Sequence, residues 1–280
     1  MTNRPLAYIV KDQKPLVLAA DETVGNACRL MRERGTGSVL VVDNMKRLSG
    51  IFTGRDAVRL LARVKDASST RLAQAMTRNP TSISPSDSAI NALRAMTEGG
   101  FRHLPVIDNG KICGVVSLRD FKGMELEEFA RRHAVDSAGG TLDRRLMDVL
   151  DCTKPFTLPG VKSVQQACRS MRRRKCGGVL VIDGKGHLTG IFTGRDAIRV
   201  IALDKDAEKL RLSSAMTKDL MTISPTCHAI EALRVMNDGG FRHLPVVEDH
   251  KILGVVTRGD FTGIELDRLD EEEHLKECLW

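Results

Sequence analysis

A hydroxyl residue and an aspartate recur three positions apart at four places in this 280-residue chain. The segments read GIFTGRD at 50–56, GVVSLRD at 114–120, GIFTGRD at 190–196 and GVVTRGD at 254–260. Their chemistry is hydrogen bonding. At the start of a helix the hydroxyl accepts from a backbone amide, and the acid reaches back to the residue before the helix, which makes a capping box. That box favours Glu or Gln, whereas all four segments carry the shorter Asp. Capping therefore explains the spacing and leaves the choice of acid open.

The chain is built from four copies of one unit. Its two halves are copies shifted by 140 residues, because GGFRHLPV at 99–106 returns unchanged at 239–246. Within each half the motif aspartates are 64 residues apart, as Asp56 and Asp120 show. Repeats at fixed offsets indicate repeated structural units. We number these copies 1 to 4 in chain order, and call copies 1 and 3 odd and copies 2 and 4 even.

Each copy carries signals for the order strand, helix, strand, strand, helix. Apolar and small residues at i, i+3, i+4 and i+7 predict a helix within 24–31 and at the matching place in the other copies. In copy 2, Ser86 and Asp87 are candidate N-caps of this helix, and Gly99–Gly100 is a natural stop. Two short apolar runs joined by a turn follow at 103–117 and predict paired strands.

This order of elements resembles the CBS domain. In that domain the last strand ends with the pattern G-h-h-S/T-x-x-D, where h is an apolar residue and x is any residue, and the middle strand begins with H-L-P-V. The pairing within each half resembles a Bateman module, where two CBS domains pack sheet to sheet. The resemblance implies an α/β (α+β) fold of four CBS domains of β-α-β-β-α order, paired into two Bateman modules as a pseudo-symmetric disc. We expect repeats at 1–66, 67–126, 147–206 and 207–266, a linker at 127–146 and an acidic C-terminal tail at 267–280.

The resemblance also implies a ligand, because modules of this family bind adenosine-containing compounds in clefts between paired domains. The hydroxyl and carboxylate of the S/T-x-x-D segment would hold the two ribose hydroxyls, through charge-assisted bonds worth about 1.5–3 kcal/mol each. The ribose-binding candidates are Thr53, Asp56, Ser117, Asp120, Thr193, Asp196, Thr257 and Asp260. The same residues can cap their helices when the ligand is absent.

The even copies carry FRHLPV where the odd copies carry GSVLVV and GGVLVI. In the family, residues at this place face the phosphates of a nucleotide whose ribose the partner domain holds. The phosphate-binding candidates are therefore Arg102, His103, Arg242 and His243. We expect Asp56 and Asp196 to serve two strong sites with these residues, and Asp120 and Asp260 to serve two weak or vacant ones. Taken without the resemblance, Arg and His at a strand start are explained equally well as exposed residues.

Composition limits the other function classes. The net charge of +7 permits anionic ligands without pointing to nucleic acid. The seven cysteines include no C-x-x-C, so no zinc site is expected, and we expect reduced thiols. No apolar run approaches the roughly 18–20 residues of a membrane span, and the start of the chain lacks the apolar core of a secretory signal. We therefore expect a cytoplasmic location and no membrane partner.

No catalytic motif stands out, since P-loop, H-E-x-x-H and nucleophile-elbow patterns are missing from the sequence. We expect a regulatory module rather than an enzyme, with AMP, ADP or ATP as ligand and no catalytic cofactor. It would act in trans on an unknown protein partner or through its own assembly, as a monomeric disc or a homodimer. S-adenosylmethionine and NAD are alternative ligands.

A second function remains open at the basic run MRRRK, residues 171–175, which could attract nucleic acid. Positive charge at the end of a helix also complements the helix dipole, which explains the run without a partner. Tyr8 and Trp280 are the single tyrosine and tryptophan, so stacking of bases would have to rest on Phe and His. We therefore do not expect a nucleic-acid partner.

Overall fold

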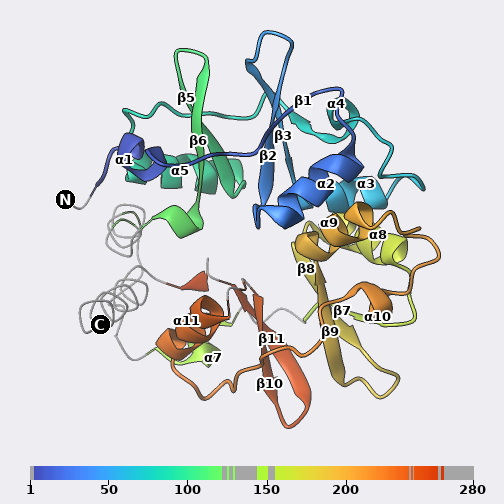
Figure 1. Ribbon diagram of the computed structural model, residues 1–280. Coiled ribbons are helices and arrows are strands. Elements are labelled where there is room, and N and C mark those ends of the chain that lie inside the picture. The colour runs from blue at the N-terminus through green and yellow to red at the C-terminus, as the bar shows by residue number, and fades with distance from the viewer. Residues whose placement is uncertain are drawn as a thin grey trace.

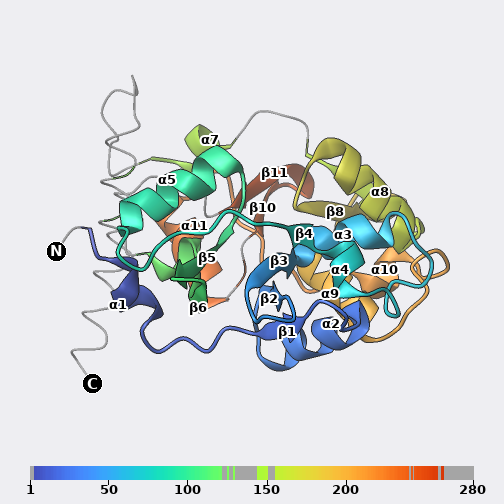
Figure 2. The same ribbon diagram turned by 90° about the horizontal axis from the view of Figure 1, so that it is seen from above.

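The computed structural model describes residues 3–121, 125, 129, 144–150, 155–239, 241, 243–257 and 260–261. The expected linker at 127–146 lies largely outside the described residues, and the expected tail at 267–280 lies wholly outside them. The four copies lie around a common centre (Figure 1) and form a body that is thinner in the perpendicular direction (Figure 2). The disc of paired α/β units is therefore confirmed.

The odd copies show the full predicted order of elements. In copy 1 these are β1 (Val17–Ala19), α2 (Val24–Glu33), β2 (Ser38–Val42), β3 (Leu48–Thr53) and α3 (Gly54–Leu61). In copy 3 they are β7 (Thr157–Pro159), α8 (Val164–Arg174), β8 (Gly178–Ile182), β9 (Leu188–Thr193) and α9 (Gly194–Ala202). The first strand of each pairs parallel with the second, and the second pairs antiparallel with the third.

The even copies keep the helix and the hairpin but reduce the first strand to a single bridge. In copy 2 the elements are α4 (Leu72–Ala75), β4 (Thr77–Arg78), α5 (Ala89–Gly99), β5 (His103–Asp108), β6 (Lys111–Ser117) and η1 (Leu118–Asp120). In copy 4 they are α10 (Leu212–Ala215), α11 (Ala229–Asp238), β10 (His243–Glu248) and β11 (Lys251–Thr257). The bridges are parallel and join Ile83 to Val106 and Ile223 to Val246.

The ends of α5 confirm one sequence signal and correct another. Gly100 takes the left-handed conformation, with φ 61°, and ends the helix as expected. The N-cap is Ser88, whose side chain accepts from the amide of Asn91, rather than Ser86 or Asp87. Asp87 Oδ2 instead accepts from the Ser84 amide at 3.1 Å, so this acid closes the preceding turn. Several neighbouring Ser and Asp residues could have capped the helix. Because Asp87 is used in the preceding turn, Ser88 is the residue that caps it.

Copies 1 and 3 share one hydrophobic core, which is formed by α2, α3, α8 and α9 together with their sheets. The N-termini of α3 and α9 meet there. A Cβ atom built on Gly194 would lie 2.9 Å from the backbone of Gly54. Cys28 and Cys168 are buried in this core, and burial raises the pKa of both thiols to about 12. Both side chains therefore act as small apolar residues.

Two short helices before the odd copies pack on the even ones. Helix α1 (Leu6–Val10) completes the core of copy 2, and α7 (Leu146–Val149) completes that of copy 4. Copy 2 in turn contributes a segment to copy 1, because β4, near the start of copy 2, pairs with β3 of copy 1. The paired copies thus exchange segments, which ties each even copy to its odd partner.

Candidate functional site

Each motif aspartate lies directly after a strand, where its Oδ2 caps the following turn. Asp56 Oδ2 accepts from the Thr53 amide at 2.9 Å and from Thr53 Oγ1 at 2.7 Å. The corresponding distances are 2.6 and 2.8 Å for Ser117 and Asp120, 2.8 and 2.9 Å for Thr193 and Asp196, and 2.6 and 3.0 Å for Thr257 and Asp260. The capping role is therefore present in all four copies, and it engages one carboxylate oxygen.

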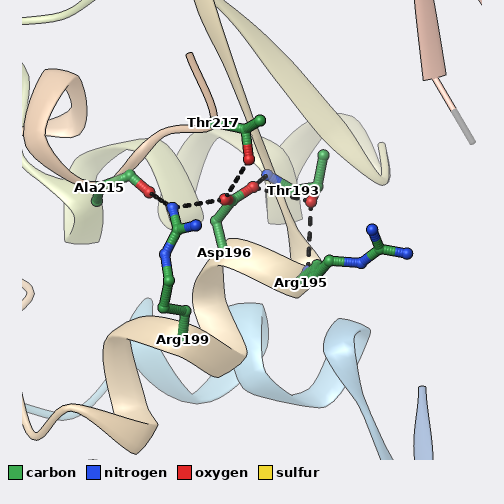
Figure 3. Close-up of polar contacts among 6 residues, drawn as sticks. All are labelled: Thr193, Arg195, Asp196, Arg199, Ala215 and Thr217. Atoms are coloured by element: carbon green, nitrogen blue, oxygen red, sulfur yellow. Dashed lines mark hydrogen bonds and ion pairs between the residues drawn. The ribbon is translucent and has the colours of Figure 1, made fainter. Parts of the chain in front are cut away.

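The other oxygen distinguishes the odd copies. Figure 3 shows that Asp196 Oδ1 accepts from Arg199 Nη2 and from Thr217 Oγ1, both at 2.8 Å. Arg199 is itself held by the Ala215 carbonyl at 2.5 Å. In copy 1, Thr77 Oγ1 lies 2.9 Å and Arg59 Nη2 lies 3.2 Å from Asp56 Oδ1. Asp56 and Asp196 are each 2% exposed, so both acids are buried with both oxygens engaged.

The even copies leave their second oxygen open. No partner for Oδ1 of Asp120 or Asp260 is found among the residues that the structure describes. Asp120 is half-buried and Asp260 is exposed. A carboxylate with one oxygen fixed by its own backbone and the other facing solvent is a preorganised acceptor for hydroxyl groups.

The difference between the acids can be traced in the sequence. Arg59 and Arg199 lie three residues after their aspartates, where both even copies have glycine, Gly123 and Gly263. Arginine at i+3 on a helix reaches the acid, and glycine has no side chain to do so. The second oxygen of each odd acid is therefore bound by an arginine that the even copies lack.

The even acids are positioned by arginines from the chain segment before each module. Arg4 forms a two-pronged ion pair with the buried Glu125, with distances of 2.8 and 2.9 Å, and its Nη2 also donates to the Asp120 carbonyl at 3.2 Å. One repeat later, Arg144 Nη2 donates to the Asp260 carbonyl at 3.3 Å. The backbone of each open acid is thus held from outside its own copy.

The phosphate-binding candidates lie at the junctions between copies. Arg55, next to the acid of copy 1, donates to the Gly100 carbonyl of copy 2 at 2.9 Å. Arg102 extends across to copy 3, where a Cβ atom on Gly177 would lie 3.2 Å from Arg102 Nη2 and 3.6 Å from His243 Nε2. An arginine and a histidine from different modules therefore lie close to the same glycine of copy 3.

Electrostatics at this junction favour an anion. The pKa of Arg102 is lowered, first by burial of its guanidinium and then by the nearby charge of Arg55, while Asp260 acts in the opposite direction. The side chain still keeps an exposed surface, as expected for a cation that lines an open space. Two crowded arginines are stabilised by a negative ligand between them.

The two candidate histidines, His103 and His243, lie beside the motif hydroxyls. His103 is paired across the hairpin with Ser117, and His243 with Thr257. His243 also borders the odd copy, because a Cβ on Gly178 would lie 3.3 Å from Thr193 Cγ2 and 3.8 Å from His243 Cδ2. The structure therefore places each histidine opposite the motif hydroxyl residue of its own copy, and His243 also near the motif threonine of copy 3. Arg242 lies outside the described residues.

The family is decided by a match to the CBS domain, which covers residues 9–63, 72–124, 147–203 and 212–266. The chain belongs to the CBS-domain family. The CBS domain-containing protein CBSCBSPB2 of Arabidopsis thaliana is 31% identical over 287 residues, covering 87% of this chain and 52% of that protein. The meiotically up-regulated gene 70 protein of Schizosaccharomyces pombe is 26% identical, covering 92% of this chain and 43% of that protein. The chain thus spans about half the length of the curated relatives it matches.

Among solved structures, protein MJ1225 of Methanocaldococcus jannaschii, which has been proposed as an archaeal homologue of γ-AMPK, has the same four-CBS fold. It matches with a TM-score of 0.72 and 16% identity, over 95% of this chain and all of that one. This likeness shows that the two chains share one fold over nearly the whole of both.

Sequence reasoning missed four residues of the CBS sites, namely Thr77, Thr217, Arg59 and Arg199. A signal for the threonines was present, since AMT recurs at 75–77 and 215–217. The recurrence showed a repeated turn, but the contact of its threonine with an acid 21 residues earlier requires the pairing of β3 with β4.

Two further features concern other site types. Among the described residues, no group of three or more His, Cys, Asp or Glu side chains is placed to hold a metal ion. No helix in the described part of the chain combines the length and the apolar character that a membrane span requires.

Proposed function

We propose that this four-CBS chain is a regulatory module that binds an adenine nucleotide, AMP, ADP or ATP, and that the ribose is held at Asp120 and Asp260. The observation that carries this proposal is the open Oδ1 of both acids, next to Oδ2 atoms fixed by their own caps. A vicinal diol can donate one hydroxyl to each free lone pair of such a carboxylate. Ser117 and Thr257 are the hydroxyl residues that accompany these two acids.

This assignment reverses the ranking expected from the sequence, which placed the stronger sites at Asp56 and Asp196. In the structure those acids are buried and hydrogen-bonded through both oxygens, and Thr53 and Thr193 serve the same caps. A ribose there would have to displace a threonine hydroxyl and an arginine. Each such bond to a charged group is worth about 1.5–3 kcal/mol, so the exchange gains little.

The cations at the junctions supply the phosphate end of the site. Arg102 feels the charge of Asp260 and lies beside His243, so a nucleotide held on Asp260 can direct its phosphates toward both residues. We propose that His103 and Arg242 do the same for a nucleotide held on Asp120. Because Arg102 and Asp260 belong to different modules, the ligand would join the two modules. Binding would then shift the population between module arrangements, which a protein partner can detect in trans.

The test is calorimetric titration of the wild-type chain with AMP, ADP, ATP, S-adenosylmethionine and NAD, with 2′-deoxy-AMP as the matched control for AMP. We expect saturable binding of at least one adenine nucleotide. Loss of one hydroxyl donor to a charged acceptor should weaken binding by about tenfold or more. Failure of every compound to bind at millimolar concentration, or equal affinity for AMP and 2′-deoxy-AMP, would contradict the proposal. Preference for S-adenosylmethionine or NAD would change the ligand while keeping the ribose site.

A further inference from the structure

Helix α8 lies at the outer edge of the disc, where copies 1 and 3 meet (Figures 1 and 2). A groove with mainly basic lining residues runs along its exposed face. Its volume is about 460 Å³. The residues that line it are Leu158, Lys162, Gln166, Arg169, Ser170, Arg172 and Arg173. Four of these carry positive charge and none carries negative charge.

These cations are largely unneutralised by the protein. Within the described residues, none of Lys162, Arg172 and Arg173 takes part in an ion pair, and all three are exposed. Arg169 donates to the Ala62 carbonyl at 3.1 Å, which fixes its position at the seam without cancelling its charge. Uncompensated like charges on one face repel each other, so a ligand that neutralises them is favoured.

The fold does not require this charge, because copy 1 provides an internal comparison. At the places of Lys162 and Arg173, helix α2 and its preceding turn carry Glu22 and Glu33. Helix α2 has the same position in its copy, buries the same set of small residues and ends with a glutamate. The last turn of α2 carries only Arg32 as a basic residue, whereas that of α8 carries Arg172, Arg173 and Arg174. The helix dipole therefore does not require the two additional arginines of α8, since its counterpart forms without them.

The residue after α8 adds a second observation. Lys175 has φ 53° in the left-handed region, where copy 1 has Gly35 with φ 62°. A side chain in this conformation costs roughly 1–2 kcal/mol, which glycine avoids. Copy 3 thus places another cation at the end of this face against the preference of the backbone.

We infer that the α8 face is a docking surface for an acidic segment of a protein partner. Carboxylates of that segment would pair with Lys162, Arg172 and Arg173, and an apolar side chain would contact Leu158 and Val161, which is 72% exposed. The inference goes beyond nucleotide binding, because no residue of the groove belongs to the ribose or phosphate sites. It provides the surface through which the chain could act in trans.

Peptide chemistry fits the groove better than nucleic-acid chemistry. Proteins that bind single strands combine a positively charged groove with aromatic side chains on which the bases stack, and no aromatic side chain lines this groove. Phe156, the nearest candidate in sequence, is covered by Arg174 at 4.6 Å from its ring centre. A mixture of cations and leucine or valine side chains suits acidic residues that flank an apolar anchor.

The test is fluorescence anisotropy of the full chain with a fluorescein-labelled glutamate-rich peptide of about 12 residues containing two leucines, at physiological salt. The α8 variant is Arg172→Glu/Arg173→Glu, and the matched control is Arg29→Glu/Arg32→Glu on the equivalent face of copy 1. We expect the α8 variant to lose about tenfold or more in affinity and the control to lose less than about threefold, because rim charges act mainly where the partner carries complementary charge.

Three outcomes would overturn the inference. These are failure of the wild-type chain to bind the peptide saturably, equal losses in both variants, and tighter binding of a single-stranded oligonucleotide of equal charge with the same dependence on Arg172 and Arg173. Calorimetry with ATP on the same α8 variant shows whether its nucleotide sites are intact. A failure at α8 is thereby separated from a failure of the proposed nucleotide function.

Discussion

At the scale of the residue, four aspartates of one motif have two different environments. Asp56 and Asp196 are buried and saturated, whereas Asp120 and Asp260 keep one oxygen open. The cap is common to all four, so the difference comes from the second oxygen and from the arginine three residues later. An odd acid is part of the framework, and an even acid is available to a ligand.

This division predicts different costs of removal without any ligand. Asp56→Ala leaves the Arg59 guanidinium, the Thr77 hydroxyl and the Thr53 amide without their acceptor, and we expect the free energy of unfolding to fall by about 2–4 kcal/mol. Asp120→Ala removes mainly a cap and should cost about 1 kcal/mol. Urea denaturation of the two variants, followed by circular dichroism, measures the difference.

The second half of the chain supplies the control for this prediction. Asp196→Ala should behave like Asp56→Ala, and Asp260→Ala like Asp120→Ala, because the contacts are repeated. Equal destabilisation by all four substitutions would show that the second oxygen contributes nothing, and the distinction between odd and even acids would be lost.

The sequence located the four acids and their caps, since both depend on residues three positions apart. It did not rank them. Thr77 reaches Asp56 from 21 residues away through the pairing of β3 with β4, and such a contact depends on the packed module. The sequence shows glycine in the even copies at the places of Arg59 and Arg199. That this difference frees an acid oxygen follows only from the structure, in which each arginine contacts its acid.

At the scale of the element, the repeated GIFTGRD has a second explanation besides the acid. Gly54 and Gly194 begin α3 and α9, and a Cβ atom added to either would lie 2.9–3.0 Å from the backbone of the other. The even copies have Leu118 and Arg258 at this place. Glycine recurs in the odd copies because those two helices pack against each other, which no property of a single copy reveals.

A methyl group at this contact should therefore destabilise the chain. In Gly194→Ala the new Cβ would lie 2.9 Å from Gly54 backbone atoms, and we expect a loss of about 1–3 kcal/mol from overpacking. Gly184→Ala is the matched control, because a Cβ there has no heavy atom within 4 Å and should change stability by less than about 0.5 kcal/mol. Thermal denaturation measures the loss of stability in both variants. Equal losses in Gly194→Ala and Gly184→Ala would contradict the close contact.

The order of elements was predictable because helix periodicity and turn residues are local properties. The first strands of the even copies were less so, since each is reduced to one bridge. The exchange of α1 and β4 between paired copies was not predictable, because a repeat in sequence does not show which copy a connecting segment packs against.

At the scale of the whole molecule, the odd copies and the even copies differ in what they contribute to the structure. The odd copies share one core and hold the two modules together. The even copies present open acids, and Arg102 and His243 from different modules both lie next to Gly177 of copy 3. A nucleotide bound there would contact both modules, while the α8 face lies at the outer edge. The two proposals thus place the nucleotide between the modules and the protein partner at the outer edge of the disc.

The most direct test of this account is calorimetric titration of the Asp120→Ala/Asp260→Ala double variant, compared with the wild-type chain, using the nucleotide that the wild type prefers. The account predicts two nucleotides per wild-type chain and an affinity at least about 10- to 100-fold lower in the variant, because a charged acceptor of the ribose is removed from each site. Binding of two nucleotides by the folded double variant with wild-type affinity would contradict it.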